Sequence, residues 1–276
     1  MSSKRPSLLL SFDVEEFDLP EEYGVAVPEA ERIGVAQDGM ARILDVLETA
    51  GVRATMFITG YFAERSPELL RRMVSGGHEI ASHGLNHTRF EPVHLAQSKA
   101  LLERLAGAEV VGFRMARLAP VAKSEIVAAG YRYESSMNPI FLPGRYNNLC
   151  KPLLPFQESD GSGLWQYPIS AVPWVRFPLF WLSFKNLPLW LYTSLACFSA
   201  RRTGYYNMYS HPWEYSPLSR EPKWNVPKYI TRHAGDGQAS RLLGLLNSMK
   251  KTGDFVTFRE SMERFCVPAG QEQEVQ

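Results

Sequence analysis

Residues 78–87 read HEIASHGLNH, an apolar, β-rich run that ends in two histidines. His83 and His87 stand four positions apart and are flanked by small and polar residues. Both imidazoles can therefore swing toward one point, and imidazole is a ligand type that zinc and related divalent metals favour. The pattern predicts a metal site directly after a strand. A pair of histidines that are merely solvated or hydrogen-bonded is the competing interpretation.

Similar β-rich runs recur along the chain, with helical patterns between most of them. The runs cover residues 7–12, 53–59, 78–82, 108–113, 131–135, 164–169, 205–210 and 255–258. The expected helices cover residues 38–50, 66–76, 92–105, 122–129 and 238–250. Strands that alternate with helices are typical of an α/β fold with a parallel sheet, either closed into a barrel or open. Residues 138–163, rich in Pro, Gly and Asn, are expected to form a long irregular insertion near a binding cleft.

Length and charge limit the class of protein. The chain has 276 residues, of which 45% are apolar, and we expect one domain over residues 1–267 with a polar, frayed tail at 268–276. Lys and Arg number 30 against 29 Asp and Glu, without a long run of either, so no nucleic-acid partner is expected. The three cysteines, Cys150, Cys197 and Cys266, have no paired spacing and are expected to be buried free thiols. The sequence leaves the oligomeric state open.

No export signal or membrane span is expected. Lys4 and Arg5 precede an apolar run that is far too short for a signal peptide. We therefore expect a cytoplasmic protein, which can work at the inner membrane surface. Residues 178–200 are apolar but interrupted, and their charge-free part is shorter than the roughly 20 residues that a bilayer requires. The aromatic part, residues 174–192, either packs in the core or makes peripheral contact with a membrane.

Reactive side chains follow four of the expected strands. They are Asp13 and Glu15, then His83 and His87, then Arg114, and finally His211. The carboxyl ends of parallel strands converge on one face of a barrel or sheet, and such proteins carry their chemistry there. We therefore expect four separate segments to meet at one site.

The two carboxylates after the first run share one face. Residues two apart in an extended segment point the same way, so Asp13 and Glu15 lie together while Val14 points to the opposite side. One carboxylate can complete a metal site of two histidines and one carboxylate, and the other can remain free as a base. The alternative is a solvated acidic loop, since acidic residues crowd positions 15–22.

Several motifs in order resemble one known family. They read SFDVEEFD (11–18), ATMFITG (54–60), GHEIASHGLNH (77–87), GFRMARLAP (112–120), YRYESSMNP (131–139), LWQYPIS (164–170) and YSHPWE (209–214). The combination resembles the polysaccharide deacetylase family, the NodB-homology carbohydrate esterases, whose members remove N- or O-acetyl groups from sugars. The resemblance runs from about Leu8 to Phe258. It is closest to the intracellular branch associated with exopolysaccharide synthesis, which carries DVE and HPWE signatures.

This resemblance implies a fold and a set of roles. The fold is a single-domain distorted (β/α) barrel with about seven strands. The implied roles are catalytic base for Asp13, metal ligands for His83 and His87, orientation of the base for Arg114, and general acid for His211. A backbone N–H near Met115 is expected to stabilise the oxyanion.

Two departures from the family pattern affect these roles. Val14 stands where the family usually has its metal-binding aspartate. Either Glu15 replaces that ligand or the two histidines alone bind the metal weakly, and we favour Glu15. In addition, Met115 to Arg117 intervene where a proline usually follows the arginine. The expected metal is Zn²⁺, although Co²⁺, Ni²⁺ and Mn²⁺ also suit two nitrogens and a carboxylate.

The resemblance implies a metal-dependent hydrolase that removes an N-acetyl group from a sugar during surface-polysaccharide synthesis. A cytoplasmic enzyme would meet a lipid-linked or nucleotide-linked sugar, or a growing chain. Trp165 and Trp213 either stack on that sugar or belong to the core. The alternatives are a deformylase of a lipid-linked amino sugar and a glycan-binding module without catalytic activity.

Overall fold

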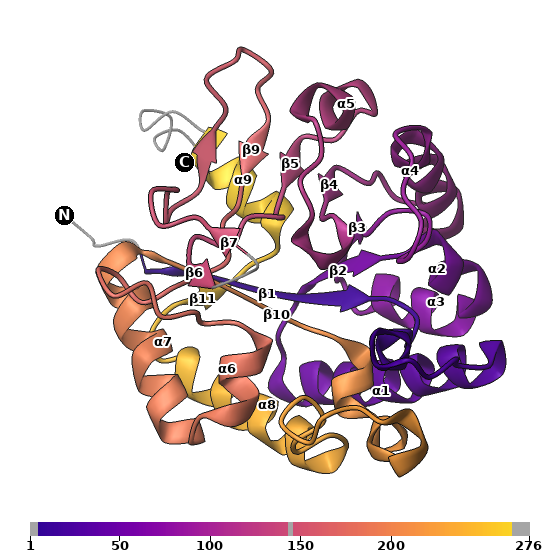
Figure 1. The fold of residues 1–276 in the computed structure, drawn as a ribbon. Helices are drawn as coiled ribbons and strands as arrows, with labels where there is room; N and C mark the ends of the chain where they lie inside the picture. Colours follow the sequence, from indigo (N-terminus) through magenta and orange to yellow (C-terminus); the bar gives the residue numbers. More distant parts are fainter. Residues whose placement is uncertain (1–4, 143–145, 267–276) are drawn as a thin grey trace.

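A curved sheet of mostly parallel strands forms the centre of the computed structural model, which describes residues 5–142 and 146–266 (Figure 1). The sheet runs in the order β10-β1-β2-β3-β4-β5-β9-β8, and β11 pairs with β1 beside it. The strands are β1 Ser7–Val14, β2 Thr55–Ile58, β3 Glu79–Ser82, β4 Gly112–Phe113, β5 Tyr133–Glu134, β8 Phe156–Gln157, β9 Trp165–Gln166, β10 Tyr205–Ser210 and β11 Asp254–Phe255. Only β8 runs antiparallel to its neighbour in this sheet. The tail expected at residues 268–276 lies outside the described residues.

Strand β1 lies in the middle of the sheet. It pairs with β10 along one edge, and its other edge pairs first with β11 and then with β2. Its even-numbered residues, such as Leu10 and Phe12, pack in the cluster that includes Met40 of the first helix. Leu9 instead packs inside the barrel with Phe57. Side chains of a strand point alternately to its two faces, so Asp13 points to the same side as Leu9, toward the interior of the barrel.

The segment after β9 closes the barrel. The Ser170 N–H donates to the Asn207 carbonyl of β10 at 3.0 Å, and the Asn207 N–H donates to Ser170 Oγ at 2.8 Å. The Tyr205 hydroxyl donates to the Pro168 carbonyl at 2.7 Å. These bonds join the two ends of the parallel sheet. The distorted (β/α) barrel expected from the resemblance is confirmed.

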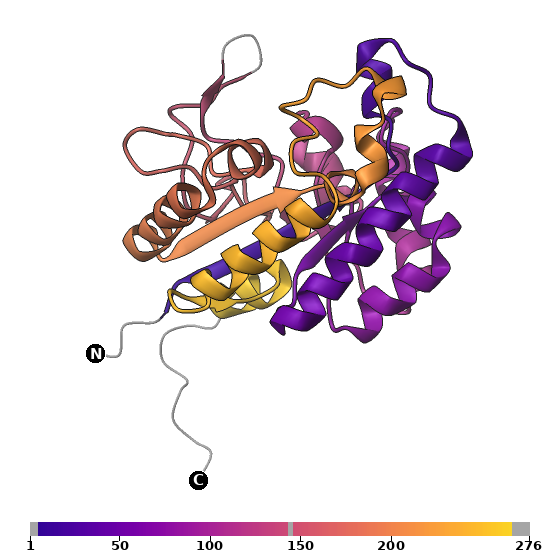
Figure 2. The ribbon, with the colours of Figure 1, turned by 90° about the horizontal axis from the view of Figure 1, so that it is seen from below.

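Helices cover the outside of the barrel (Figures 1 and 2). They are α1 Glu29–Ala50, α2 Gly60–Arg65, α3 Pro67–Ser75, α4 Val93–Ala106, α5 Lys123–Ala128, α6 Trp181–Asn186, α7 Leu189–Thr203, α8 Asp236–Met249 and α9 Phe258–Cys266. Figure 2 shows α1 and α8 side by side along the sheet, and they are in contact. Their apolar stripes, which include Met40 and Leu242, meet in the same core.

Several helices differ from the expectation, and α6, α7 and α9 were not expected. Helix α1 begins at Glu29 rather than at residue 38, because Pro28 occupies its N-cap and Ile33 and Ala36 extend its buried face. Helix α2 was not expected either. The Thr59 side chain caps it by accepting a hydrogen bond from the Phe62 N–H at 3.2 Å, which allows a short helix directly after β2.

The expected insertion contains more regular structure than its composition indicates. Strands β6 Phe141–Leu142 and β7 Tyr146–Asn147 form an antiparallel pair, and β8 joins the main sheet. Within this insertion Cys150 is exposed, because it lies in a surface turn closed by a hydrogen bond from the Lys151 N–H to the Asn148 carbonyl. The expectation of a buried thiol is wrong there. Cys197 is partly exposed.

The apolar residues 178–200 contribute to α6 and α7. Among residues 5–142 and 146–266, the structure contains no helix that is both long and apolar enough to cross a bilayer. Several side chains of this segment pack in the core, among them Phe184 and Tyr192, whose ring centroids lie 5.1 Å apart. Trp190 is instead 70% exposed. The segment thus serves both as core and as surface.

Candidate functional site

The carboxyl ends of the central strands bring the expected reactive residues to one mouth of the barrel. Asp13 lies on β1 and Glu15 directly after it; His83 follows β3, Arg114 follows β4 and His211 follows β10. Glu15, Glu16 and Asp18 are all at least 95% buried. The first three acidic residues after β1 are therefore folded into the site, and the solvated-loop interpretation is wrong for them, whereas Glu21 and Glu22 are exposed.

Glu15, His83 and His87 converge on one another. The Nε2 atoms of His83 and His87 lie 3.2 and 3.0 Å from the same oxygen, Oε2 of Glu15. One ligand atom from each of the three residues lies within 4.8 Å of the others. The structure therefore places Glu15, one position beyond Val14, where a third ligand would stand.

The second nitrogen of each imidazole has its own acceptor. His83 Nδ1 lies 2.9 Å from the Arg114 carbonyl, and His87 Nδ1 lies 2.6 Å from Oδ2 of Asp18. A proton on each Nδ1 leaves both Nε2 lone pairs directed at Glu15. Histidine ligands of metals are usually oriented in this way by a carbonyl or a carboxylate. Asp18 was missed in the sequence; its one signal was its place in the acidic stretch.

Burial and the neighbouring charges act in opposite directions on the pKa values of this group. Burial alone would raise the pKa of Glu15, but the nearby histidines, His87 first, hold it well below its usual value. Burial would lower the pKa of His87, whereas the charges of Glu15 and Asp18 raise it well above its usual value. Two imidazole nitrogens and a carboxylate oxygen suit a divalent cation of the zinc type, which could take the place of the shared proton. The residues fit a metal ligand set.

Arg114 holds Asp13 at the edge of this group. Its Nη1 donates to Asp13 Oδ1 at 2.6 Å and to Ser11 Oγ at 2.9 Å, while its Nε donates to the Ser135 carbonyl at 2.9 Å. The guanidinium is fully buried and lies 4.0 Å from the centre of the Phe57 ring. Arg114 is thus a rigid support that orients the carboxylate.

His211 lies on the opposite wall and is supported by two buried charges. Its Nδ1 lies 2.9 Å from Glu214 Oε1, and Glu214 Oε2 pairs with Lys185 Nζ at 3.0 Å. Lys185 and Glu214 are both fully buried. Burial would lower the pKa of His211, but the charges of Glu15 and Glu214 outweigh it and raise this pKa. Lys185 was not recognised in the sequence, because it occurs in an apolar stretch far from the motifs.

A close backbone approach fixes the position of His211. The short 3₁₀ helix Pro212–Tyr215 packs directly on α1 at Gly39. A Cβ atom at Gly39 would stand 1.8 Å from the Pro212 carbonyl oxygen, so no larger residue fits there without movement of the backbone. Gly39 therefore sets how deeply His211 enters the site.

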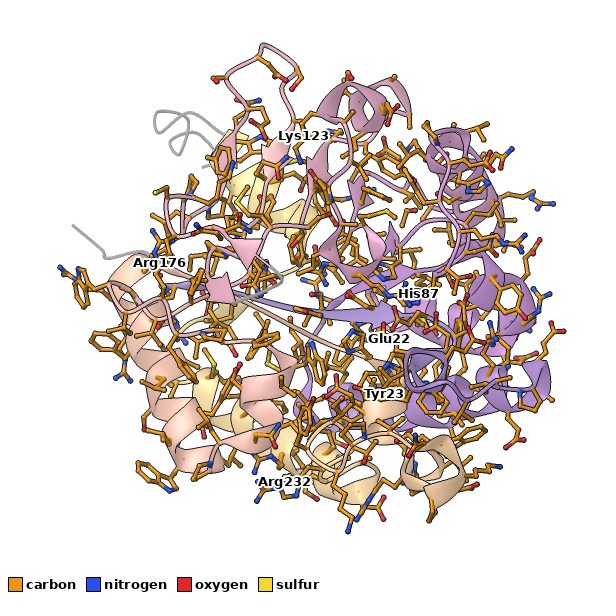
Figure 3. All side chains as sticks on the ribbon, in the orientation of Figure 1. Glu22, Tyr23, His87, Lys123, Arg176 and Arg232 are labelled. Atoms are coloured by element: carbon orange, nitrogen blue, oxygen red, sulfur yellow. The ribbon has the colours of Figure 1, made fainter. Side chains whose placement is uncertain are left out.

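A pocket opens above these groups. Asp13, Glu15, His87 and His211 line it, with Trp213 among the apolar walls. Figure 3 shows His87 near Glu22 and Tyr23 at the carboxyl end of β1, and both of these line the same pocket. The acidic groups and the pocket thus form one cleft.

The two tryptophans expected to bind substrate lie in different places. Trp213 lines the pocket and stacks on the His211 ring, with centroids 5.0 Å apart. Trp165 does not line the pocket; it packs beside Tyr167 in the cluster inside the barrel, because β9 places it well before the carboxyl end of the sheet. A role for Trp165 in stacking on a sugar is inconsistent with this position. Trp181 lines the pocket and was missed.

The segment after Arg114 has an unusual backbone. Arg117 and Leu118 adopt left-handed conformations, with φ of 55° and 52°, and both line the pocket. Arg117 Nε lies 3.1 Å from Glu22 Oε1 across the pocket rim. The Met115 N–H donates to Ser136 Oγ at 2.9 Å, so the expected oxyanion donor already has an acceptor in this structure. The absence of the usual proline accompanies this distinct loop.

Comparison with known proteins agrees with the motifs. Residues 3–117 match the family described as "Polysaccharide deacetylase". A chitooligosaccharide deacetylase from Bradyrhizobium sp. (strain ANU 289) is 45% identical over 56 residues, which cover 19% of this chain and 26% of that protein. The match therefore spans only about a quarter of the relative's length. It supports common ancestry of that segment.

Solved structures extend the similarity to the fold of nearly the whole chain. A "probable Polysaccharide deacetylase" from Pseudomonas aeruginosa PAO1 has a TM-score of 0.66 at 17% identity, covering 94% of this chain and 89% of that one. The Puue allantoinase has the same TM-score at 16% identity and the same coverage. The fold is therefore shared by proteins with different named activities. The ordered motifs and the family match place residues 3–117 in the polysaccharide deacetylase family, and the barrel agrees with this assignment.

Proposed function

We propose that this protein is a metal-dependent hydrolase that removes the N-acetyl group from a sugar during the synthesis of a surface polysaccharide. One observation carries the proposal: Glu15 and His87 of the group that they form with His83 line the same pocket as Asp13, which Arg114 holds, and His211, which Glu214 holds. Amide hydrolysis needs a base for the attacking water, a stabiliser of developing charge and an acid for the leaving nitrogen. The pocket supplies a candidate for each.

Asp13 is the proposed base. Arg114 binds Oδ1 and fixes the plane of the carboxylate, which lines the pocket beside Glu15. Asp13 accepts a proton as water attacks the acyl carbon, and Arg114 keeps the carboxylate from rotating away. A divalent metal held by Glu15, His83 and His87 would act as a Lewis acid toward the acyl oxygen and would lower the pKa of water.

His211 is the proposed acid. Glu214 accepts from His211 Nδ1, so Nε2 is the nitrogen that faces the reaction. The charges of Glu15 and Glu214 raise the pKa of this ring and so favour its protonated form, and the proton passes from Nε2 to the sugar nitrogen as the C–N bond breaks. The products are acetate and a free amino sugar. Trp213, stacked on the ring, keeps the imidazole from turning.

Zinc is the proposed metal because the ligand set joins two imidazoles and one carboxylate. The proposed substrate is lipid-linked or nucleotide-linked, or a growing chain. Trp181 and Trp213 stand T-shaped at 5.6 Å between ring centroids and form one apolar wall of the pocket. An aromatic wall beside acidic groups suits the apolar face of a pyranose ring.

A product assay tests the proposed function. The zinc-loaded protein is incubated with free, oligomeric, nucleotide-linked and lipid-linked N-acetyl sugars and with their N-formyl counterparts. We expect acetate and free amine in equal amounts, and we expect a chelator to stop the release. Release of formate alone would favour the deformylase. If the protein binds metal but releases neither acetate nor formate from any sugar of the panel, the glycan-binding module without catalytic activity would be favoured.

The support of His211 by Glu214 predicts a specific pH effect. His211 acts while protonated, so activity is lost as the pH rises through its pKa. Removing the negative charge in Glu214→Gln lowers that pKa, and the alkaline limb of kcat/KM should move down by about 1 unit or more. The matched control is Glu22→Gln at the pocket rim, which should leave the limb in place. If the alkaline limb of kcat/KM does not move in Glu214→Gln, His211 is not the acid.

Because Lys185 would then lose its partner, the same experiment includes the double variant Lys185→Met, Glu214→Gln. Breaking a buried ion pair typically costs about 3–5 kcal/mol of folding stability, whereas replacing both members costs much less. The double variant should therefore unfold at a higher temperature than Glu214→Gln. It should keep the lowered alkaline limb, which separates the effect on His211 from a general loss of stability.

A further inference from the structure

One outer side of the protein combines exposed aromatic residues with exposed arginines. We define the basic aromatic face by Trp174, Val175, Trp190, Phe198, Arg201 and Arg202. Trp174, Val175 and Trp190 are 71%, 72% and 70% exposed. We infer that this face docks the protein on a bilayer that contains anionic phospholipids, which goes beyond the proposed hydrolase site.

The first part of the face is a loop with a defined shape. Ala171 and Pro178 pair across its base, and the Val172 N–H donates to the Phe177 carbonyl at 2.8 Å. At its tip Trp174 has a φ of 65°, which is an unusual backbone for a bulky side chain. The loop thus presents Trp174 and Val175 outward in a fixed conformation.

A hydrogen bond anchors this loop to the body of the protein. Arg176, also left-handed with a φ of 53°, donates from Nη1 to the Lys151 carbonyl at 2.8 Å. Strained residues persist where the surrounding structure holds them, and they are common at functional sites. The exposure of Trp174 is therefore built into the fold and is not the result of a loose loop.

The second part of the face is the outer stripe of α7. Trp190 and Phe198 stand eight residues apart, two turns of one helix face, and Arg201 and Arg202 follow in the last turn. The ring of Phe198 lies 6.2 Å from that of Trp174, and the Arg202 guanidinium lies 5.4 Å from the Trp174 ring centre. The loop and the helix therefore form one continuous surface.

Charge identifies what this face would bind. The sequence contains no Asp or Glu between Asp160 and Glu214, although the protein as a whole is nearly neutral. Lys185 of α6 is buried, so Arg201 and Arg202 of α7 supply the exposed charge of these two helices. Trp beside Arg suits the interface of a bilayer, where the indole sits at the headgroups and the guanidinium meets lipid phosphate. An apolar face for another protein would not require this absence of acids.

The loop of the basic aromatic face leads along the chain into one wall of the pocket. Phe180, Trp181 and Leu182 line the pocket, and they follow the loop directly along the chain. Figure 3 shows Arg176 on one side of the molecule and His87 nearer its middle, at the carboxyl end of β1. A protein docked through this face would therefore keep the catalytic residues out of the lipid.

The test is sedimentation of the full chain with vesicles. We expect binding to phosphatidylcholine mixed with phosphatidylglycerol, weak binding to phosphatidylcholine alone, and loss of binding at high salt. Arg201→Gln and Arg202→Gln should each lower the affinity about fivefold, the value of one charge near an anionic surface. Trp174→Ser should weaken binding to the same vesicles, and brominated lipid should quench wild-type tryptophan fluorescence.

Matched controls lie across the barrel on α4, which Figures 1 and 2 place on the opposite side from α7. Val93 is 53% exposed and Arg104 is exposed there, so Val93→Ser and Arg104→Gln should bind vesicles like the wild type. Asp13→Asn should also bind vesicles like the wild type. A failure of the docking inference can therefore be distinguished from a failure of the proposed hydrolysis. The inference is overturned if anionic vesicles bind no protein, if the face variants bind like the controls, or if Trp174→Ser abolishes only self-association.

Discussion

Replacing Asp13 by asparagine should lower kcat/KM for acetate release by about 10²- to 10⁴-fold, the usual contribution of a general base. Asparagine keeps the size and the acceptor oxygen that Arg114 binds, but it cannot take the proton of the attacking water. Asp13 is 3% exposed, and its Oδ1 lies 2.6 Å from Arg114 Nη1. The measurement is initial rates of acetate release at saturating zinc, with circular dichroism to check the fold.

The buried position of Arg114 makes a stability control necessary. Loss of one member of a buried ion pair typically costs about 3–5 kcal/mol, so Asp13→Asn should also unfold at a lower temperature. Zinc binding should survive, because Glu15, His83 and His87 are unchanged. The control is Asp45→Asn. Asp45 lies on α1 and forms an exposed ion pair with Arg72, so this variant should keep full activity. Activity of Asp13→Asn close to that of the wild type would assign the base to another group.

The fold and the meeting point of the reactive residues could be predicted from the sequence because both depend on local signals. In β1 the side chains alternate between the two faces of the sheet, which indicates that Asp13 and Glu15 share one face. The reactive residues of the other segments come directly after the carboxyl ends of their strands. Parallel pairing then brings distant segments together without further information. The proximity of Glu15 to His83 and His87 follows from this, since β1 and β3 both flank β2.

Partners that act through other residues could not be predicted in this way. Asp18 and Lys185 lie outside the strands: Asp18 precedes a short 3₁₀ helix and contacts His87, and Lys185 lies on α6 and contacts Glu214, so both contacts depend on how these segments pack. Their surroundings in sequence were misleading: an acidic run indicates a solvated loop, and a lysine in an apolar segment indicates a surface. Trp165 shows the opposite failure. It belongs to a strand with a motif, yet the register of β9 directs it into the barrel.

The third ligand is the most direct test of how this chain departs from the family pattern. Glu15→Gln should lower zinc affinity by more than about 100-fold, since loss of an orienting partner alone costs about 10- to 100-fold. Gln keeps the volume and one oxygen but loses the charge that both Nε2 atoms face at 3.2 and 3.0 Å. Isothermal titration with zinc measures the change. Glu22→Gln, a pocket carboxylate outside the ligand group, should bind zinc normally.

Asp18→Asn gives an intermediate case that distinguishes a ligand from its support. It removes the charge that orients His87 at 2.6 Å and should cost about 10- to 100-fold in zinc affinity. In the wild type, zinc must displace a proton from His87, because Glu15 and Asp18 raise the pKa of this imidazole. The affinity of the protein for zinc should therefore increase as the pH rises. If His83→Ala lost zinc while Glu15→Gln kept it, the histidines would bind the metal without Glu15. The carboxylate one position beyond Val14 would then not be a ligand, and the metal would have only two protein ligands.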